Sequence, residues 1–311
     1  MVDILIRFIP VFGIMAIGAF LRSKALLSGS IIDGMKLLIV NLGLPALFFL
    51  SFLTVEIRIS YGLLFFSVFL YCLLLFGIGK ALTRTRIAKD HLNKFFFSGF
   101  EFGMVGVALF TSLFGASQLH YIALIGLGHE LFIWFVYAPL LQAEERGILE
   151  LKSIFASFIR SPIIVAILSA LALNISGAYH LFADTALYGQ VEGMLIMLGQ
   201  LTTPLILLAL GAQLTFSGIS WRDSAALIAS RLVLLAVTGP LFMLGVHLLL
   251  FPLEPMMIYA FVTFLMLPPP YIIPVFLGNR HKEEALFYNR TLILYTVCTL
   301  VLYPLVMVIL Q

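Results

Sequence analysis

Charged residues are scarce in this sequence. They make up 11% of its 311 residues, with 18 basic and 15 acidic side chains. Soluble domains carry about twice that share, so the composition excludes a single water-facing fold. Cysteine is scarcer still, and both Cys72 and Cys298 lie in apolar stretches. No disulfide framework or zinc site is therefore indicated, and we expect neither a metal nor a cofactor. Glycine and proline are not enriched, which excludes a fibrous chain.

Long apolar runs dominate the sequence instead. Hydrophobic residues make up 62% of the chain, and a helix that crosses a bilayer needs about 20 mostly apolar residues. Charged or Gly/Pro-rich loops divide the runs into ten segments. The sequence therefore predicts an all-α polytopic membrane protein with ten transmembrane helices. Their expected ranges are 4–21, 34–54, 61–81, 95–114, 119–142, 161–178, 191–216, 224–250, 256–277 and 286–310.

The distribution of basic residues predicts how the chain is threaded. Asp3 precedes the first helix, whereas Arg22 and Lys24 follow it, which indicates an uncleaved helix with its N-terminus outside. In that orientation, every basic residue except Arg7 and Arg58 lies near a cytoplasmic loop. We therefore expect a protein of the cytoplasmic membrane with both termini on the outer side. Arg231 and Arg290 lie one or two turns from cytoplasmic helix ends, where snorkelling to the interface is expected.

The two halves of the chain resemble each other. The stretch 41–45 reads Asn-Leu-Gly-Leu-Pro, and 200–204 reads Gln-Leu-Thr-Thr-Pro. Gly115 and Gly278 form a second pair at nearly the same offset, and Pro139 and Pro304 a third. The sequence thus predicts two five-helix repeats, 1–145 and 146–311. An odd number of helices per repeat places the second copy upside down, and inverted repeats are typical of secondary transporters.

Two helices at corresponding positions are expected to be broken. The fourth carries Gly99, Gly103 and Gly106, and the ninth carries three prolines at 268–270. Glycine weakens a helix, and three successive prolines cannot lie in a continuous one. Both breaks fall near the bilayer midplane by the helical rise. Broken backbone at that depth is tolerated only where it is buried or lines a cavity, so the crossing of these helices is the predicted binding site.

Three ionisable residues lie deep in the predicted helices. Glu101 lies about 9 Å into the fourth helix, and His129 and Glu130 lie within the fifth. A carboxylate at such depth indicates an ion path, a proton relay or a substrate contact. Glu101 is expected to bind and release a proton, or else to face a cytoplasmic vestibule. Glu130 is either a proton or substrate residue or part of a satisfied buried network.

These motifs together resemble the auxin efflux carrier family, within the bile acid/auxin carrier-like superfamily, over nearly the full length. The stretches 26–28 and 41–47 are similar to its second-helix signature, and 204–212 is similar to its seventh-helix signature. Gly103, Gly106 and the stretch 267–268 match its crossover segments. The resemblance implies that helices 1, 2, 6 and 7 form a scaffold, often dimeric. Helices 3–5 and 8–10 would form a moving core that transports organic anions.

The chain departs from this family at its breaks. Glu101 replaces an asparagine, Ala108 replaces a proline, and Tyr271 and Ile272 stand where the ninth helix has an asparagine. An ionised Glu101 would oppose a bound anion. Either Glu101 is protonated when the anion binds, which is proton symport, or the substrate is neutral or cationic.

We therefore expect a secondary active transporter that moves a small organic anion, such as a carboxylate or an auxin-like acid, by alternating access with proton coupling. A sodium-coupled organic-anion symporter of the bile-acid-carrier type is an alternative, although the ninth helix has few polar side chains for a sodium site. A receptor or assembly protein that does not transport is a more remote alternative. An enzyme is not expected, because Ile133 stands where a zinc protease motif after His129-Glu130 needs its second histidine.

The expected site residues lie in the paired motifs and at the breaks. Expected partners are the organic anion, protons or sodium, the lipid bilayer and a second copy in a homodimer, and no nucleic acid. The coupling residues would be Glu101, His129 and Glu130. The substrate-binding residues would be Asn41, Pro45, Glu101, Gly103, Gly106, Gln200, Pro204, Pro268, Pro269, Pro270 and Tyr271.

Overall fold

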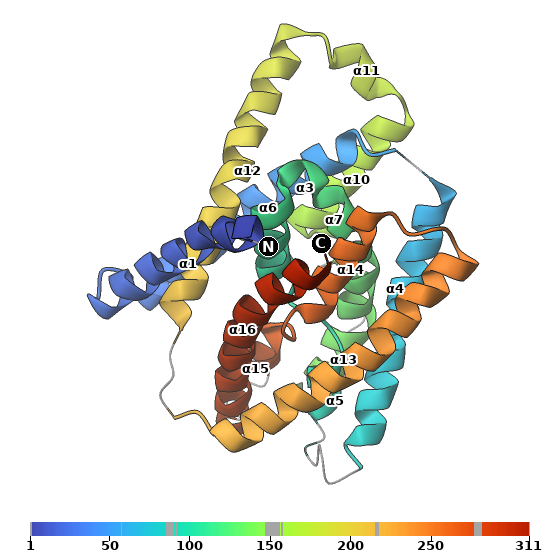
Figure 1. Cartoon of the computed structure of the whole chain (residues 1–311). Helices are drawn as coiled ribbons and strands as arrows, with labels where there is room; N and C mark the ends of the chain where they lie inside the picture. The colour runs from blue at the N-terminus through green and yellow to red at the C-terminus, as the bar shows by residue number, and fades with distance from the viewer. Residues whose placement is uncertain are drawn as a thin grey trace.

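The computed structural model describes residues 2–56, 58–84, 90, 92–146, 156, 158–214, 218–276 and 282–310. Every regular element within these residues is a helix (Figure 1). The first half contains α1 (Val2–Ser23), α2 (Gly29–Leu38), η1 (Ile39–Gly43), α3 (Leu44–Leu53), α4 (Ile59–Leu82), α5 (Asn93–Phe97), η2 (Phe102–Gly106), α6 (Val107–Phe114), η3 (Ala116–Gln118), α7 (Leu119–Phe132), η4 (Ile133–Tyr137) and α8 (Ala138–Arg146). The second half contains α10 (Pro162–Ile175), α11 (Ala178–Phe182), α12 (Ala186–Gln213), α13 (Trp221–Leu249), α14 (Pro255–Met266), α15 (Ile272–Phe276) and α16 (Lys282–Leu310).

Eight helical segments of the described chain are long and apolar enough to cross a bilayer. Two shorter apolar helices, α10 and α14, overlap the other two predicted ranges. The prediction of an all-helical, polytopic membrane protein is thus confirmed at this level. The count of ten crossings and the inverted repeat remain predictions.

Prolines shape two of the long helices. The π-helix η1 ends just before Pro45, and the π-helix η4 ends just before Pro139. A proline cannot donate to the carbonyl four residues earlier, and its ring crowds that carbonyl. A π-turn widens the helix at such a point, so the chain continues in the same direction without a full break.

The helices pack in two groups. The first helix group consists of α1, α2–η1–α3, α10 and α12; the second helix group consists of α4 to α8 and α13 to α16. In the first group, α1 crosses α12 closely (Figure 1). A side chain at Gly18 would meet the backbone of Leu208, and one at Gly211 would meet the backbone of Met15. Each group draws helices from both halves of the chain.

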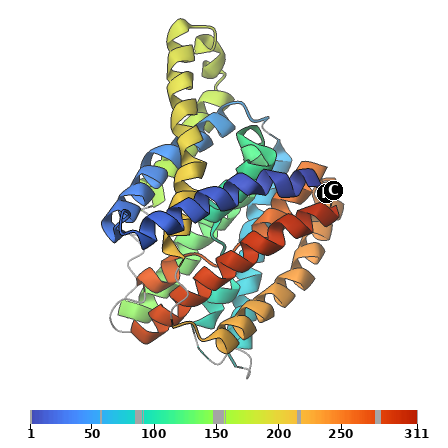
Figure 2. The same cartoon turned by 60° about the vertical axis from the view of Figure 1, so that its left-hand side comes forward.

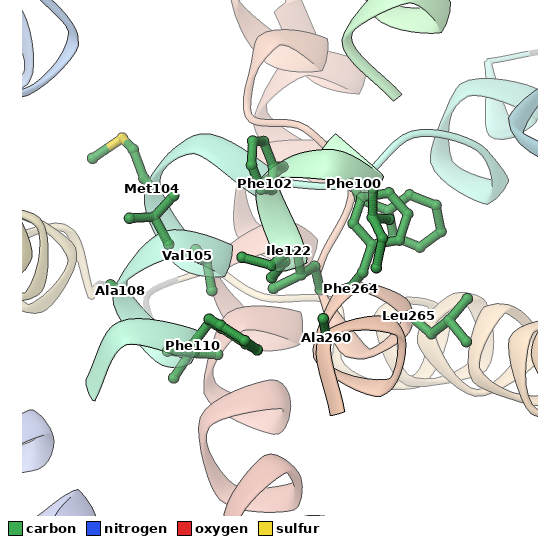
Figure 3. Packing of buried hydrophobic residues seen from close by; sticks show 14 of the residues in the cluster. Phe100, Phe102, Met104, Val105, Ala108, Phe110, Ile122, Ala260, Phe264 and Leu265 are labelled. Carbon is green, nitrogen blue, oxygen red and sulfur yellow. The ribbon is translucent and has the colours of Figure 1, made fainter. Parts of the chain in front are cut away.

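The largest apolar cluster extends through both groups and surrounds the interrupted helices. Figure 3 shows Phe100 beside Phe264, whose ring centroids are 4.3 Å apart, with Phe102 and Ile122 close by. The two ends of the chain lie together at one edge of the molecule (Figure 2). There the rings of Phe8 and Tyr303 meet edge to face, with centroids 5.6 Å apart.

Candidate functional site

Two helices of the second group are interrupted, and their interruptions lie against each other. The first break, 98–101, separates α5 from η2, and the second break, 267–271, separates α14 from α15. The backbone N–H of Glu101 donates to the carbonyl of Pro268 over 2.7 Å. The chain therefore brings together the glycine-containing and proline-containing segments that the sequence singled out.

The first break lies earlier in the chain than the position of Gly103 and Gly106 suggested, because both of these residues lie within the π-helix η2. The glycine that the break requires is Gly99, whose φ of +69° favours a residue without a side chain. A Cβ there would also lie 3.0 Å from the rings of Pro270 and Tyr137. Gly106 serves close packing instead, since its Cβ would lie 2.8 Å from Leu267 Cδ1.

Glu101 reaches from the first break to the second. It is half-buried, and its Oε2 accepts the backbone N–H of Tyr271 over 2.8 Å. Tyr271 immediately precedes α15, and its hydroxyl lies 2.7 Å from Thr296 Oγ1 on α16. The Glu101 carboxylate therefore binds the backbone N–H that immediately precedes α15. Of the predicted residues, Pro268, Pro269 and Pro270 are buried beside it.

His129 supports the first break from α7. Its Nε2 lies 2.9 Å from the backbone nitrogen of Phe100 and accepts that N–H, so the neutral ring carries its proton on Nδ1. Nδ1 lies 3.7 Å from Glu130 Oε1 and has no hydrogen-bond partner among the described residues. Glu130 in turn accepts the indole N–H of Trp134 over 3.1 Å. Of the three predicted coupling residues, Glu101 thus lies in the break and His129 bonds it directly, whereas Glu130 lies next to His129.

Arg231 of α13 is the residue whose role the sequence reasoning missed. It does not snorkel: its side chain is fully buried and donates to the carbonyls of Phe96 and Gly99, the latter over 2.7 Å. It also lies 3.5 Å from the carbonyl of Leu267, in the second break. The available signal was its depth, ten residues into an apolar helix that begins at Trp221. An interrupted helix leaves carbonyls unpaired, and a buried arginine is suited to bind them.

Cavities lie on two sides of the crossing, each between the two helix groups. The α16 cavity, of about 320 Å³, includes Tyr271 and Thr296 of the second group and Lys36 and Gln213 of the first. The α7 cavity, of about 580 Å³, includes Glu192 of α12 and the start of α7. Glu192 and Gln213 are about 30 Å apart along α12 at the helical rise. The two cavities therefore lie toward opposite ends of that helix.

The paired motifs of the first group lie outside the crossing network. Asn41 is exposed and donates to the carbonyl of Leu37 in its own helix. Pro204 is exposed, and Pro45 is half-buried in α3. Gln200 lines a small cavity of about 250 Å³ that shares residues with the α7 cavity. Of these four residues, only Gln200 is placed to meet a molecule that enters between the groups.

No group of three or more metal-binding side chains occurs in the described part of the chain. No family model matches this sequence, and no curated protein matches it. The candidate site is therefore defined by its geometry: two bonded breaks, a half-buried carboxylate and a buried arginine, all inside an apolar helical bundle.

Proposed function

We propose that the protein is a secondary active transporter that moves a small organic anion by alternating access and couples it to protons. The observation that supports this most strongly is the bond between the two breaks, with Glu101 held across them. Non-helical backbone and a half-buried carboxylate inside an apolar bundle are both costly, and transport sites are where membrane proteins retain them. The resemblance to auxin efflux carriers agrees with this function.

Alternating access would use the two helix groups as its moving parts. In this proposal the chain crosses the membrane ten times as two inverted repeats, 1–145 and 146–311, with both termini outside. The first helix group is the scaffold, and the second carries the crossing. The α16 and α7 cavities both lie between the groups, so a shift of one group against the other would open one cavity while it closes the other.

Proton coupling follows from the position of Glu101. Its carboxylate accepts the N–H of Tyr271, which is the kind of donor that would otherwise attract a substrate anion. An ionised Glu101 would repel an anion bound at the same N–H, because both would carry a negative charge. Uptake of a proton by Glu101 removes that repulsion, so anion and proton bind together.

Uptake into proteoliposomes tests the proposal. A panel of mono- and dicarboxylates is offered under an imposed pH gradient, and separately under a sodium gradient. We expect at least one carboxylate to accumulate with the pH gradient, and Glu101→Gln to abolish that dependence. Asp223→Asn is the matched control, because Asp223 is an exposed carboxylate at the start of α13.

Two results would contradict the proposal. Failure of every carboxylate to accumulate would reject organic-anion transport. An unchanged pH dependence in Glu101→Gln would reject its coupling role. Accumulation driven by sodium alone would instead support the sodium-coupled alternative.

A further inference from the structure

An apolar groove of about 340 Å³, the α4 groove, lies between α10 of the first helix group and α4 and α7 of the second. In the first group α10 packs on α3, and in the second α4 packs on α7 (Figure 1). The groove therefore follows a seam between these two packed pairs. Of the described residues that line it, all but Glu56, Arg58, Tyr61 and Gly62 carry aliphatic or phenylalanine side chains. Most of its length is thus suited to a hydrocarbon chain.

The charged residues of the groove lie at one of its ends. Arg58 immediately precedes α4 and donates to Glu254 over 3.3 Å. The hydroxyl of Tyr121, at the start of α7, donates to the same carboxylate over 2.9 Å. The apolar lining of α7 begins one turn further along, at Leu124, and continues to Leu131 over about 10 Å at the helical rise. A polar end followed by an apolar length fits an amphipathic molecule.

The charged end remains accessible to a headgroup. Arg58 bonds both Glu56 and Glu254, yet its side chain is 45% exposed, and those of the two carboxylates are 70% and 51% exposed. Two carboxylates and one guanidinium give this cluster a net charge of −1. A headgroup that contains an ammonium group therefore fits better than an anionic one. The ammonium can donate to the carboxylates, and a phosphate can accept from Arg58.

The groove is open along its side. Leu168, which lines it from α10, is 56% exposed, and Gly62, which lines it from α4, is exposed as well. A Cβ at Gly62 would have no atom within 4 Å. In a bilayer, the molecules that meet such an apolar opening are lipid acyl chains. A chain can therefore enter from the side.

We propose that the α4 groove binds one acyl chain of a zwitterionic phospholipid with a primary ammonium group, such as phosphatidylethanolamine. Its ammonium binds the carboxylates of Glu56 and Glu254, and its phosphate binds Arg58. The headgroup lies beside the α7 cavity, because Glu56 and Arg58 line both spaces. The bound lipid joins α10 to α4 and α7, so it favours the arrangement of the two helix groups described above. This site is separate from the crossing and does not depend on the proposed transport function.

Thermal stability in detergent tests the headgroup. The delipidated full chain is titrated with dioleoyl phosphatidylethanolamine, phosphatidylcholine and phosphatidylglycerol. We expect the ethanolamine lipid to reach half of its stabilisation at an about fivefold lower concentration than the choline lipid, because choline has no N–H to donate. The anionic glycerol lipid should be weakest. Equal stabilisation by all three lipids would overturn the inference.

Removal of the two carboxylates tests which groups recognise the ammonium. Glu56→Gln/Glu254→Gln should bind the ethanolamine and choline lipids equally well. Asp223→Asn, which changes an exposed carboxylate at the start of α13, is the control and should keep the preference of the parent. A preference that persists in the double variant would overturn the assignment of the headgroup to this cluster.

A larger side chain in α4 tests the groove itself. Gly62→Phe places a ring in the groove and should raise the half-stabilising concentration of phosphatidylethanolamine about tenfold. Gly77→Phe is the matched control: Gly77 is exposed about 20 Å further along α4, and a Cβ there would also have no atom within 4 Å. It should bind the lipid as the parent does. If the two variants bind it equally, the acyl chain does not lie in the α4 groove.

Tryptophan fluorescence locates the acyl chain with the groove left intact. The ring of Trp134 lies 6.4 Å, between centroids, from that of Phe158, which lines the groove. Trp221→Phe leaves Trp134 as the single tryptophan. Phosphatidylethanolamine with brominated acyl chains should quench its emission at the concentration that gives half of the thermal stabilisation, and Gly62→Phe should remove this quenching. Equal quenching in both proteins, in proportion to the total lipid, would show contact with bulk lipid only and overturn the inference.

Discussion

The two breaks interrupt their helices by different means. In the second break, three successive prolines remove the backbone donors and forbid the helix locally. In the first break, 98–101, the residues are Ser-Gly-Phe-Glu, and of these four only Gly99 has a positive φ. Its free groups are bound by side chains of other helices: Arg231 binds carbonyls, and His129 accepts the N–H of Phe100. One break is therefore made by its own sequence, and the other depends on its neighbours.

Of the substitutions that test this comparison, Gly99→Ala should cause the largest loss in the free energy of unfolding. Gly99→Ala places a side chain at a φ of +69° and within 3.0 Å of Pro270 and Tyr137. We expect a loss of about 2–4 kcal/mol in the free energy of unfolding, from backbone strain and steric overlap together. Thermal unfolding can be followed in detergent by the exposure of the buried thiol of Cys72.

Gly103→Ala is the matched control for this prediction. Gly103 lies in η2, and the nearest atom to a Cβ there would be 3.9 Å away. Its stability should change by less than about 1 kcal/mol. Equal losses in the two variants would show that the first break does not depend on Gly99.

Removal of the hydrogen-bond acceptor of His129 should cause the next largest loss in the free energy of unfolding. His129→Phe leaves the buried N–H of Phe100 without a partner, which costs about 1–3 kcal/mol. His129→Gln can place an oxygen near the position of Nε2 and should recover part of that loss. If His129→Phe and His129→Gln unfold at the same temperature, the hydrogen bond to the Phe100 N–H contributes nothing measurable to stability.

Loss of a hydrogen bond that supports the second break should cause the smallest loss in the free energy of unfolding. Thr299 donates from α16 to the carbonyl of Met266 over 2.8 Å, at the end of α14. Thr299→Val keeps the shape and removes the hydroxyl, which should cost about 1 kcal/mol, while uptake stays close to that of the parent. Thr299→Ser, which keeps the hydroxyl, is the comparison. A loss as large as that of His129→Phe would mean that the prolines alone do not maintain this break.

The sequence predicted some site residues better than others, for physical reasons. The meeting of Glu101 with the segment after the prolines was expected, because a carboxylate and a broken helix at similar depth are both costly in lipid. Gly99, Gly103 and Gly106 were all expected at the break, yet only Gly99 lies in it, and the helix continues through the other two as η2. Glycine permits a break without requiring one, and contacts from Arg231 and Pro270 decide where it falls.

Residues of the paired motifs stay predictions as substrate-binding residues, because the structure shows only where they lie. Asn41 and Pro204 recur in register in the two halves, which suggested a shared place at the site. The structure leaves both exposed, and Asn41 bonds its own helix. A repeated motif indicates a repeated backbone shape, but only the packing of neighbouring helices determines which face it turns inward.

By itself, the sequence determined the helical, membrane-spanning character of the chain and the break at 267–271. Both follow from local chemistry: apolar runs long enough to cross a bilayer, and prolines that have no N–H. The tertiary structure alone decided the role of Arg231, the exact place of the first break and the particular hydrogen bond that the Tyr271 N–H donates to Glu101. These depend on which carbonyls and N–H groups are left unpaired when helices distant in sequence come together, and an unpaired buried group takes whatever partner the packing provides.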